Sequence, residues 1–105
     1  MGVIVEKIAN ELIDAENHQY SIAPLTERYS ELTISDAYQI QLEVIGKKLI
    51  DGNEVIGKKV GLTSKAMQQM LGVDEPDYGH LLDDMKIADG AKVKIAKFIS
   101  PKVEA

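Results

Sequence analysis

The residues with the clearest capacity for chemistry surround Lys59. Residues 55–62 alternate in the manner of a strand, and one face of that strand carries Gly57, Lys59 and Gly61. Glycine inside a strand often marks a place where a ligand or another backbone approaches closely. A lysine in such a hollow loses part of its hydration, which lowers its pKa and suits it to proton transfer or carboxylate binding. The alternative is a solvated lysine on an edge strand, and the residue pattern by itself favours that alternative.

Thr63 and Ser64 follow this strand and precede a helix predicted over residues 65–71. The free backbone N–H groups of a helix start, together with two hydroxyls, are suited to holding a substrate carboxylate. The commoner use of such a pair is a simple helix N-cap. Both interpretations remain open from the sequence.

Two carboxylates complete the set of candidate residues. Asp77 lies in a predicted loop, residues 74–79, directly before Tyr78. A carboxylate there is either a positioned acid or base or an ordinary turn former. Glu104 follows an apolar run, and a hard cation such as Mg²⁺ usually takes carboxylate oxygens from more than one residue. Glu104 alone therefore predicts no metal site.

Hydrophobic periodicity predicts the elements that position these residues. The first half of the chain is predicted to form a helix over 3–16, a polar connecting segment over 17–31 that is broken by Pro24, and a second helix that is capped by Thr33 or Ser35 and stopped by residues 51–53. The second half is predicted to form the strand over 55–62, the helix over 65–71, a short strand over 81–85 and a final strand over 93–97. The second helix shows one apolar face formed by Tyr38, Leu42, Ile45 and Leu49. This order predicts an α+β arrangement in one domain, residues 1–105.

Composition excludes several classes of protein. The 105 residues carry a net charge of −5 and form no cluster of Lys and Arg, so nucleic acid is not an expected partner. The absence of Cys excludes disulfides and thiolate nucleophiles. Acidic residues interrupt the first apolar stretch, which excludes a signal peptide, and no run is long enough to span a membrane. The cytoplasm is the expected location.

Four stretches taken together resemble one enzyme family, the 2-keto-4-pentenoate hydratases of the fumarylacetoacetate hydrolase superfamily. These stretches are TISDAYQIQ at 33–41, IGKKVGLTSK at 56–65, QMLGV with EPDYGHL between residues 69 and 81, and PKVEA at 101–105. The resemblance runs in the same order from about residue 25 to the last residue. It implies that the chain is the N-terminal part of a longer enzyme with a mixed β fold, whose β-rich catalytic core lies beyond residue 105.

The resemblance also implies an activity and a set of roles. Such enzymes hydrate 2-hydroxypenta-2,4-dienoate to 4-hydroxy-2-oxopentanoate in the meta-cleavage breakdown of aromatic compounds, with Mg²⁺ or Mn²⁺ bound to the substrate. Lys59 matches the motif lysine of the active site, and Asp77 matches the acid of the following loop. Glu104 matches the first carboxylate of a Glu-x-Glu metal pair whose second member is not in the sequence. A homo-oligomer is the expected state of the full-length enzyme.

Two other functions compete with this one. The 4-oxalocrotonate decarboxylases resemble the hydratases in fold and metal motif, but their loop typically lacks the acid before the aromatic residue, so Asp77 favours a hydratase. A function of a different class is a non-catalytic module that packs against the rest of its protein or a partner subunit. Its final strand, residues 93–97, would then present an unpaired apolar edge.

Overall fold

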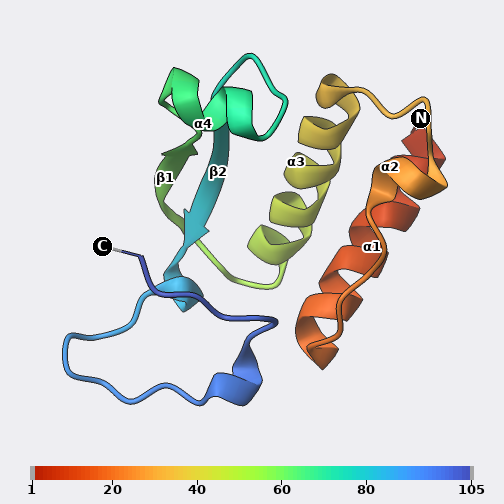
Figure 1. Cartoon of the computed structure of the whole chain (residues 1–105). Coiled ribbons are helices and arrows are strands. Elements are labelled where there is room, and N and C mark those ends of the chain that lie inside the picture. Colours follow the sequence, from red (N-terminus) through yellow and green to blue (C-terminus); the bar gives the residue numbers. More distant parts are fainter. Residues whose placement is uncertain (1, 105) are drawn as a thin grey trace. The chain divides into compact units, whose positions relative to one another are not determined.

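The computed structural model describes residues 2–104 and confirms the α+β composition (Figure 1). Its elements are α1 (Gly2–His18), α2 (Leu25–Arg28), α3 (Ile34–Ile50), β1 (Val55–Gly61), α4 (Lys65–Met70), β2 (Asp77–Leu82) and two 3₁₀ turns, η1 (Asp83–Met85) and η2 (Ile95–Lys97). The chain divides into two compact units. One comprises the residues up to 47 together with those from 88 onward, and the other comprises residues 48–87.

The core of the first unit lies between α1 and α3. Val5, Ile8 and Ile40 form a buried cluster, with Ile8 fully buried. Partly buried apolar residues around it are Leu12, Leu25, Tyr29 and Leu32. Val5 and Ile8 belong to the helical spacing that predicted α1, so that prediction is confirmed, with the helix continuing two residues further than expected. Within residues 2–104, no helix is both long and apolar enough to cross a membrane.

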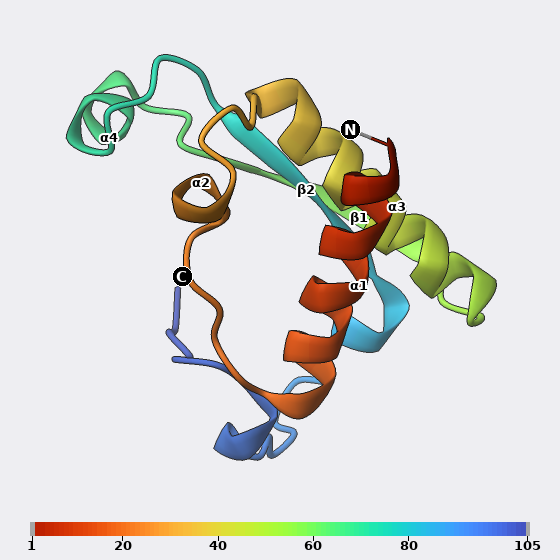
Figure 2. The ribbon, with the colours of Figure 1, turned by 90° about the vertical axis from the view of Figure 1, so that its right-hand side faces the viewer.

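The segment predicted to be irregular contains the one-turn helix α2. Pro24 is its N-cap, a position at which no hydrogen bond within the helix requires a backbone N–H. Figure 2 shows α2 beside α1. Arg28 of α2 donates two hydrogen bonds to the carboxylate of Glu11 in α1, at 2.8 and 3.0 Å. This bidentate pair lowers the pKa of Glu11 and raises that of Arg28. Residues 19–24 form no helix or strand, as expected, and only the helical turn after Pro24 was missed, because Pro is well suited to a helix start.

Helix α3 begins at a reciprocal cap. The Thr33 hydroxyl accepts a hydrogen bond from the Asp36 N–H at 3.1 Å, and the Asp36 carboxylate accepts one from the Thr33 N–H at 3.0 Å. Thr33 is thus the cap rather than Ser35. The predicted apolar face is correct only in part: Ile45 is buried, but Leu42 and Leu49 remain 54% and 43% exposed. Ile40 is buried instead, because α1 packs on the side of α3 that carries it.

Replacing Thr33 with Ala is expected to lower the free energy of unfolding by about 1 kcal/mol, the usual effect of losing an N-cap. Ser35→Ala is the matched control, since Ser35 makes no side-chain hydrogen bond within residues 2–104. Urea unfolding followed by circular dichroism measures both variants. Equal destabilisation by the two changes would show that Thr33 is not the cap.

The cap also predicts a pH dependence. Hydrogen bonds from Thr33, the backbone N–H first, hold the pKa of Asp36 below its ordinary value of 3.8. A carboxyl group whose pKa is lower in the folded state stabilises the fold above the unfolded pKa. This contribution is lost as the pH falls through the folded-state pKa. The Asp36→Asn variant should therefore lose less stability than the parent chain when the pH falls from about 5 to about 2. The shift of the urea unfolding midpoint over this pH range measures the loss in each protein.

The second unit is built on an antiparallel pair, β1 and β2, with α4 in the connection between them (Figures 1 and 2). A bulge lies between Val55 and Gly57. The predicted strand over 55–62 is confirmed except for its last residue, because Leu62 adopts a left-handed conformation with φ +53°. Asp77 was expected in a loop, but it is the first residue of β2 and pairs with Gly61.

The short strand predicted over residues 81–85 is correct only for Leu81 and Leu82, which end β2, and the strand predicted over residues 93–97 is absent from the described residues. The chain leaves β2 at Leu82 and turns into η1, where the Asp83 carboxylate accepts a hydrogen bond from the Glu54 N–H at 3.0 Å. Residues 93–97 form no strand, and Ile95 is 76% exposed in the turn η2. Alternation alone forms no strand, because a strand also needs a partner for its backbone hydrogen bonds.

Candidate functional site

The candidate site is one face of the β1–β2 pair. In an antiparallel pair, residues directly opposite one another point to the same face. The opposed positions on this face are Gly57 with Leu81, Lys59 with Gly79, and Gly61 with Asp77. The structure therefore brings Lys59 and Asp77 to the same face as diagonal neighbours, a relation that typically separates residues by about 7–8 Å. A small polar group of a ligand fits between side chains at that spacing.

Each charged side chain on this face lies over the glycine opposite it. A Cβ on Gly79 would stand 3.7 Å from Cγ of Lys59. A Cβ on Gly61 would stand only 2.5 Å from Oδ1 of Asp77, closer than real side chains approach. The Asp77 carboxylate thus occupies the space that any larger residue at position 61 would fill. The strand pattern indicated that Gly61 marks a close approach, but it did not indicate which group approaches.

Lys59 and Asp77 are both exposed, so the partial loss of hydration expected for Lys59 is not found in this chain. Within residues 2–104, neither side chain makes a hydrogen bond or ion pair. An ammonium without an internal partner can bind a carboxylate or an enolate oxygen. A carboxylate in the same state can accept a proton and, once protonated, deliver it. The face therefore presents one group of each charge to a ligand.

The turn after β1 positions Thr63 and Ser64. The Ser64 hydroxyl accepts a hydrogen bond from the Met67 N–H at 3.2 Å, so Ser64 caps α4, as the commoner interpretation of this residue had it. Thr63 is exposed next to it. The side chain of Gln68 in α4 donates a 2.7 Å hydrogen bond to the carbonyl oxygen of Leu62. The sequence did not indicate a role for Gln68, because it does not show whether Gln68 or Gln69 bonds to the preceding turn.

The opposite face of the strand pair carries a different set of residues. Lys58 pairs with His80 and Val60 pairs with Tyr78. The rings of Tyr78 and His80 meet edge to face, with centroids 6.3 Å apart. His80 therefore lies on the other side of the pair from Lys59, and its contact with Tyr78 gives it a structural role.

Glu104, the expected metal ligand, is exposed and belongs to the other compact unit. Ala105, the last residue of the same motif, lies outside the described residues. Among residues 2–104, no group of three or more His, Cys, Asp or Glu side chains is arranged to hold a metal ion. The carboxylates that the structure describes therefore do not by themselves build a site for Mg²⁺, which binds through several oxygens.

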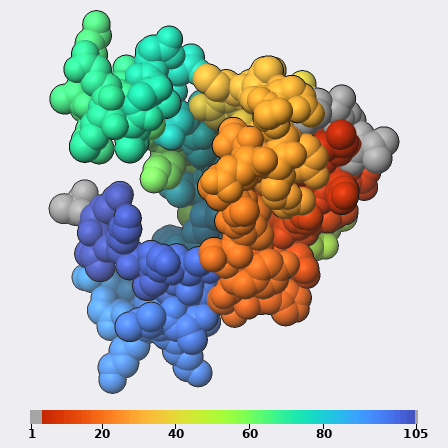
Figure 3. All heavy atoms as spheres, turned by 45° about the vertical axis from the view of Figure 1, so that its right-hand side comes forward, coloured from red at the N-terminus to blue at the C-terminus, as the bar shows by residue number. Residues whose placement is uncertain are grey.

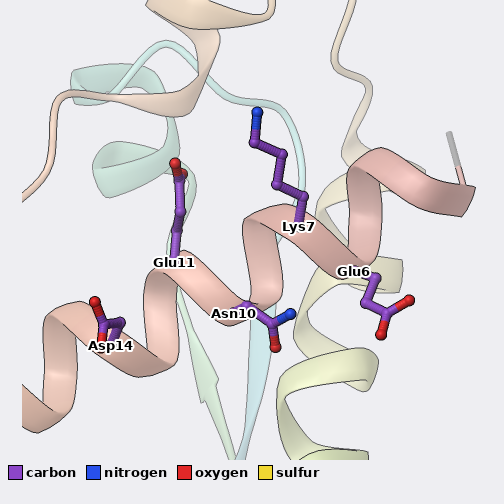
Figure 4. A pocket seen from close by; sticks show the side chains of 5 residues that line it. All are labelled: Glu6, Lys7, Asn10, Glu11 and Asp14. Carbon is purple, nitrogen blue, oxygen red and sulfur yellow. The ribbon is translucent and has the colours of Figure 1, made fainter.

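Two hollows outside the strand pair offer no comparable chemistry. The lining of the first, among the residues that the structure describes, comes from α1, namely Glu6, Lys7, Asn10, Glu11 and Asp14. Figure 4 shows Lys7 and Glu11 pointing to one side of the helix while Glu6 and Asn10 point to another, so these groups do not converge. The second hollow lies among residues 93–103 and is lined mainly by apolar side chains.

Comparison with known proteins shows extensive similarity to one group of enzymes. The chain is 40% identical over 102 residues to 2-hydroxypent-2,4-dienoate hydratase of Pseudomonas putida, which covers 96% of this chain and 46% of that protein. It is 41% identical over 100 residues to 2-keto-4-pentenoate hydratase of Paraburkholderia xenovorans (strain LB400), which covers 95% of this chain and 37% of that protein. No protein-family model matches the chain.

Among solved structures, 4-oxalocrotonate decarboxylase from Pseudomonas putida G7 superposes with a TM-score of 0.91 at 35% identity, over 94% of this chain and 38% of that one. Its two complexes hold calcium with acetate and magnesium with adipate. The chain spans less than half the length of each of these relatives.

Proposed function

We propose that this chain, a relative of the 2-keto-4-pentenoate hydratases over nearly its whole length, supplies the lysine and aspartate of a hydro-lyase active site. The substrate is 2-hydroxypenta-2,4-dienoate and the product is 4-hydroxy-2-oxopentanoate. One observation carries the proposal: Lys59 and Asp77 share a glycine-lined sheet face and have no partner within residues 2–104.

Each residue on this face has a role that suits its chemistry. The Lys59 ammonium binds the substrate carboxylate and favours the enolate form by its charge. Asp77 transfers the proton when the dienol tautomerises to the unsaturated ketone, after which water adds at the far carbon. The exposed Thr63 hydroxyl is a further substrate contact. Ser64 was also expected to bind substrate, and its oxygen already caps α4, so its contribution is to hold Thr63 in place.

A divalent metal ion at this site would need oxygen ligands in addition to those that the described residues provide. The 4-oxalocrotonate decarboxylase of known structure holds calcium in one complex and magnesium in the other, which favours a divalent cation, and Mn²⁺ is a further candidate. Glu104 supplies one oxygen ligand in this proposal. Since the described residues bring no other ligands into a cluster, no step of the reaction is assigned to the metal here.

A 4-oxalocrotonate decarboxylase is the second candidate function. It is favoured by the superposition on two decarboxylase complexes. The carboxylate of Asp77 weighs against it, because the family resemblance implies that the decarboxylase loop lacks an acid before the aromatic residue. In both candidates the chain belongs to a fumarylacetoacetate-hydrolase-like enzyme that forms a homo-oligomer in the cytoplasm. A purely structural packing module is the remaining alternative.

Loss of the ultraviolet absorbance of 2-hydroxypenta-2,4-dienoate tests the proposal. It is measured with and without Mg²⁺, on the 105-residue chain and on a longer protein that contains it. Metal-dependent hydration by the longer protein supports the hydratase. Release of CO₂ from 4-oxalocrotonate without hydration establishes the decarboxylase instead. A protein that is inactive in both assays favours the packing module.

A further inference from the structure

The conformation of Leu62 is unusual for its residue type. Its φ of +53° lies in the left-handed region, which glycine adopts freely and a residue with a Cβ adopts at a cost. Such strain persists only where surrounding contacts hold it, and it gathers at binding and catalytic sites. Leu62 stands between Gly61, which faces Asp77, and the exposed Thr63. Its conformation therefore sets the direction in which the chain leaves the candidate site.

One side chain makes a hydrogen bond to this residue. Gln68 donates its side-chain N–H to the Leu62 carbonyl oxygen at 2.7 Å, in a partly buried position. Its backbone N–H also bonds to the carbonyl oxygen of Ser64 at 3.1 Å, so one residue of α4 is tied to the turn twice. The residues of α4 other than Gln68 are exposed, and Figure 3 draws this region in green and teal. Since α4 has six residues, the helix by itself restrains the turn only weakly.

We propose that Gln68 is a positioning residue of the active site and acts by locking Leu62 in its left-handed conformation. The inference rests on the proposed function for its kinetic consequence. When the lock is intact, Thr63 stands beside the face that carries Lys59 and Asp77, ready for substrate. When it is lost, Leu62 relaxes toward conformations with negative φ, and the competent turn becomes a minor population. The apparent affinity for substrate then falls in proportion to the fraction of molecules that keep the left-handed turn, while turnover of bound substrate is preserved.

Gln68→Ala is expected to raise KM about tenfold, as for the loss of one partly buried hydrogen bond, and to change kcat by less than about twofold. Gln68→Glu has the same shape but lacks the donor at neutral pH, so it should behave like Gln68→Ala. Gln69→Ala is the matched control. It changes the same residue type in the same helix, and Gln69 makes no side-chain hydrogen bond within residues 2–104.

Leu62→Gly provides a rescue that a merely structural role of Gln68 does not predict. Glycine adopts positive φ without a steric cost, so it needs no lock. Replacing Gln68 with Ala should therefore raise KM by less than about threefold when residue 62 is already Gly, relative to Leu62→Gly alone. An equal effect of Gln68→Ala in both backgrounds would overturn the inference.

A measurement without activity separates this inference from the proposed function. In the 105-residue chain, the left-handed Leu62 should give a strong NOE between its own amide and Hα protons. That NOE should weaken in Gln68→Ala and Gln68→Glu and persist in Gln69→Ala. An unchanged NOE in the two Gln68 variants contradicts the lock whatever the kinetics show. A weakened NOE in a protein without dienoate activity supports the lock and contradicts the proposed function alone.

Discussion

Lys59→Ala should lower kcat/KM for dienoate hydration by at least about a hundredfold in an active protein that contains this chain. That is the lower end of the effect of one acid–base group, and here the same ammonium also binds the substrate carboxylate. Because Lys59 is exposed and makes no hydrogen bond or ion pair within residues 2–104, its removal should not destabilise the fold. A large kinetic loss at unchanged stability is the expected combination.

Lys58→Ala is the control for this experiment. Lys58 is the preceding residue of β1, carries the same charge and points to the opposite face, where it pairs with His80. Its removal should leave kcat/KM within about threefold of the parent value. If the two variants lose activity equally, net charge rather than a positioned ammonium is responsible, and the role assigned to Lys59 is wrong.

Gly61→Ala should lower kcat/KM by up to about a hundredfold while leaving stability nearly unchanged. The added Cβ would stand 2.5 Å from Oδ1 of Asp77, so the carboxylate must move by about 1 Å. A displacement of that size is enough to disable an oriented catalytic group. The fold tolerates the change, because the atom that gives way is the end of an exposed side chain rather than backbone.

Two comparisons show whether the effect acts through Asp77. Gly57→Ala adds the same methyl group to the same face, where the nearest atom, Cδ1 of Leu81, is at an ordinary 3.7 Å, so activity should be kept. In an Asp77→Ala background the obstructed carboxylate is gone, and Gly61→Ala should cause no further loss. Additive losses in the double variant would mean that Gly61 has a role independent of Asp77.

The local residue patterns were sufficient for the elements that carry the site. Helical spacing predicted α1 and α3, because one side of each helix has to be apolar to form a core. The alternation of residues 55–62, with glycines on one side, predicted β1 and the shared face of Gly57, Lys59 and Gly61. The four stretches that resemble the hydratases predicted the relatives that the comparisons found. The site roles of Lys59, Asp77, Thr63, Ser64 and Glu104 remain predictions.

Pairing between distant segments accounts for what the patterns missed. Asp77 was expected in a loop because it follows Pro76 in a segment that ends at Gly79, yet pairing with Gly61 extends β2 to include it. Alternation at residues 93–97 suggested a strand, but those residues have no strand partner within residues 2–104. Leu42 and Leu49 were expected in the core, and only the packing direction of α1 decided that Ile40 lies there instead.

Spacing along the chain thus determined which side chains share a face, since the geometry of a single strand or helix is a local property. The approach of Asp77 to Gly61 and of Gln68 to Leu62 required the folded chain. Asp77 and Gly61 are 16 residues apart in sequence, and Gln68 reaches back six residues from α4 into the turn. The register of β2 and the course of the turn are set by hydrogen bonds between segments, and no periodicity within one segment encodes them.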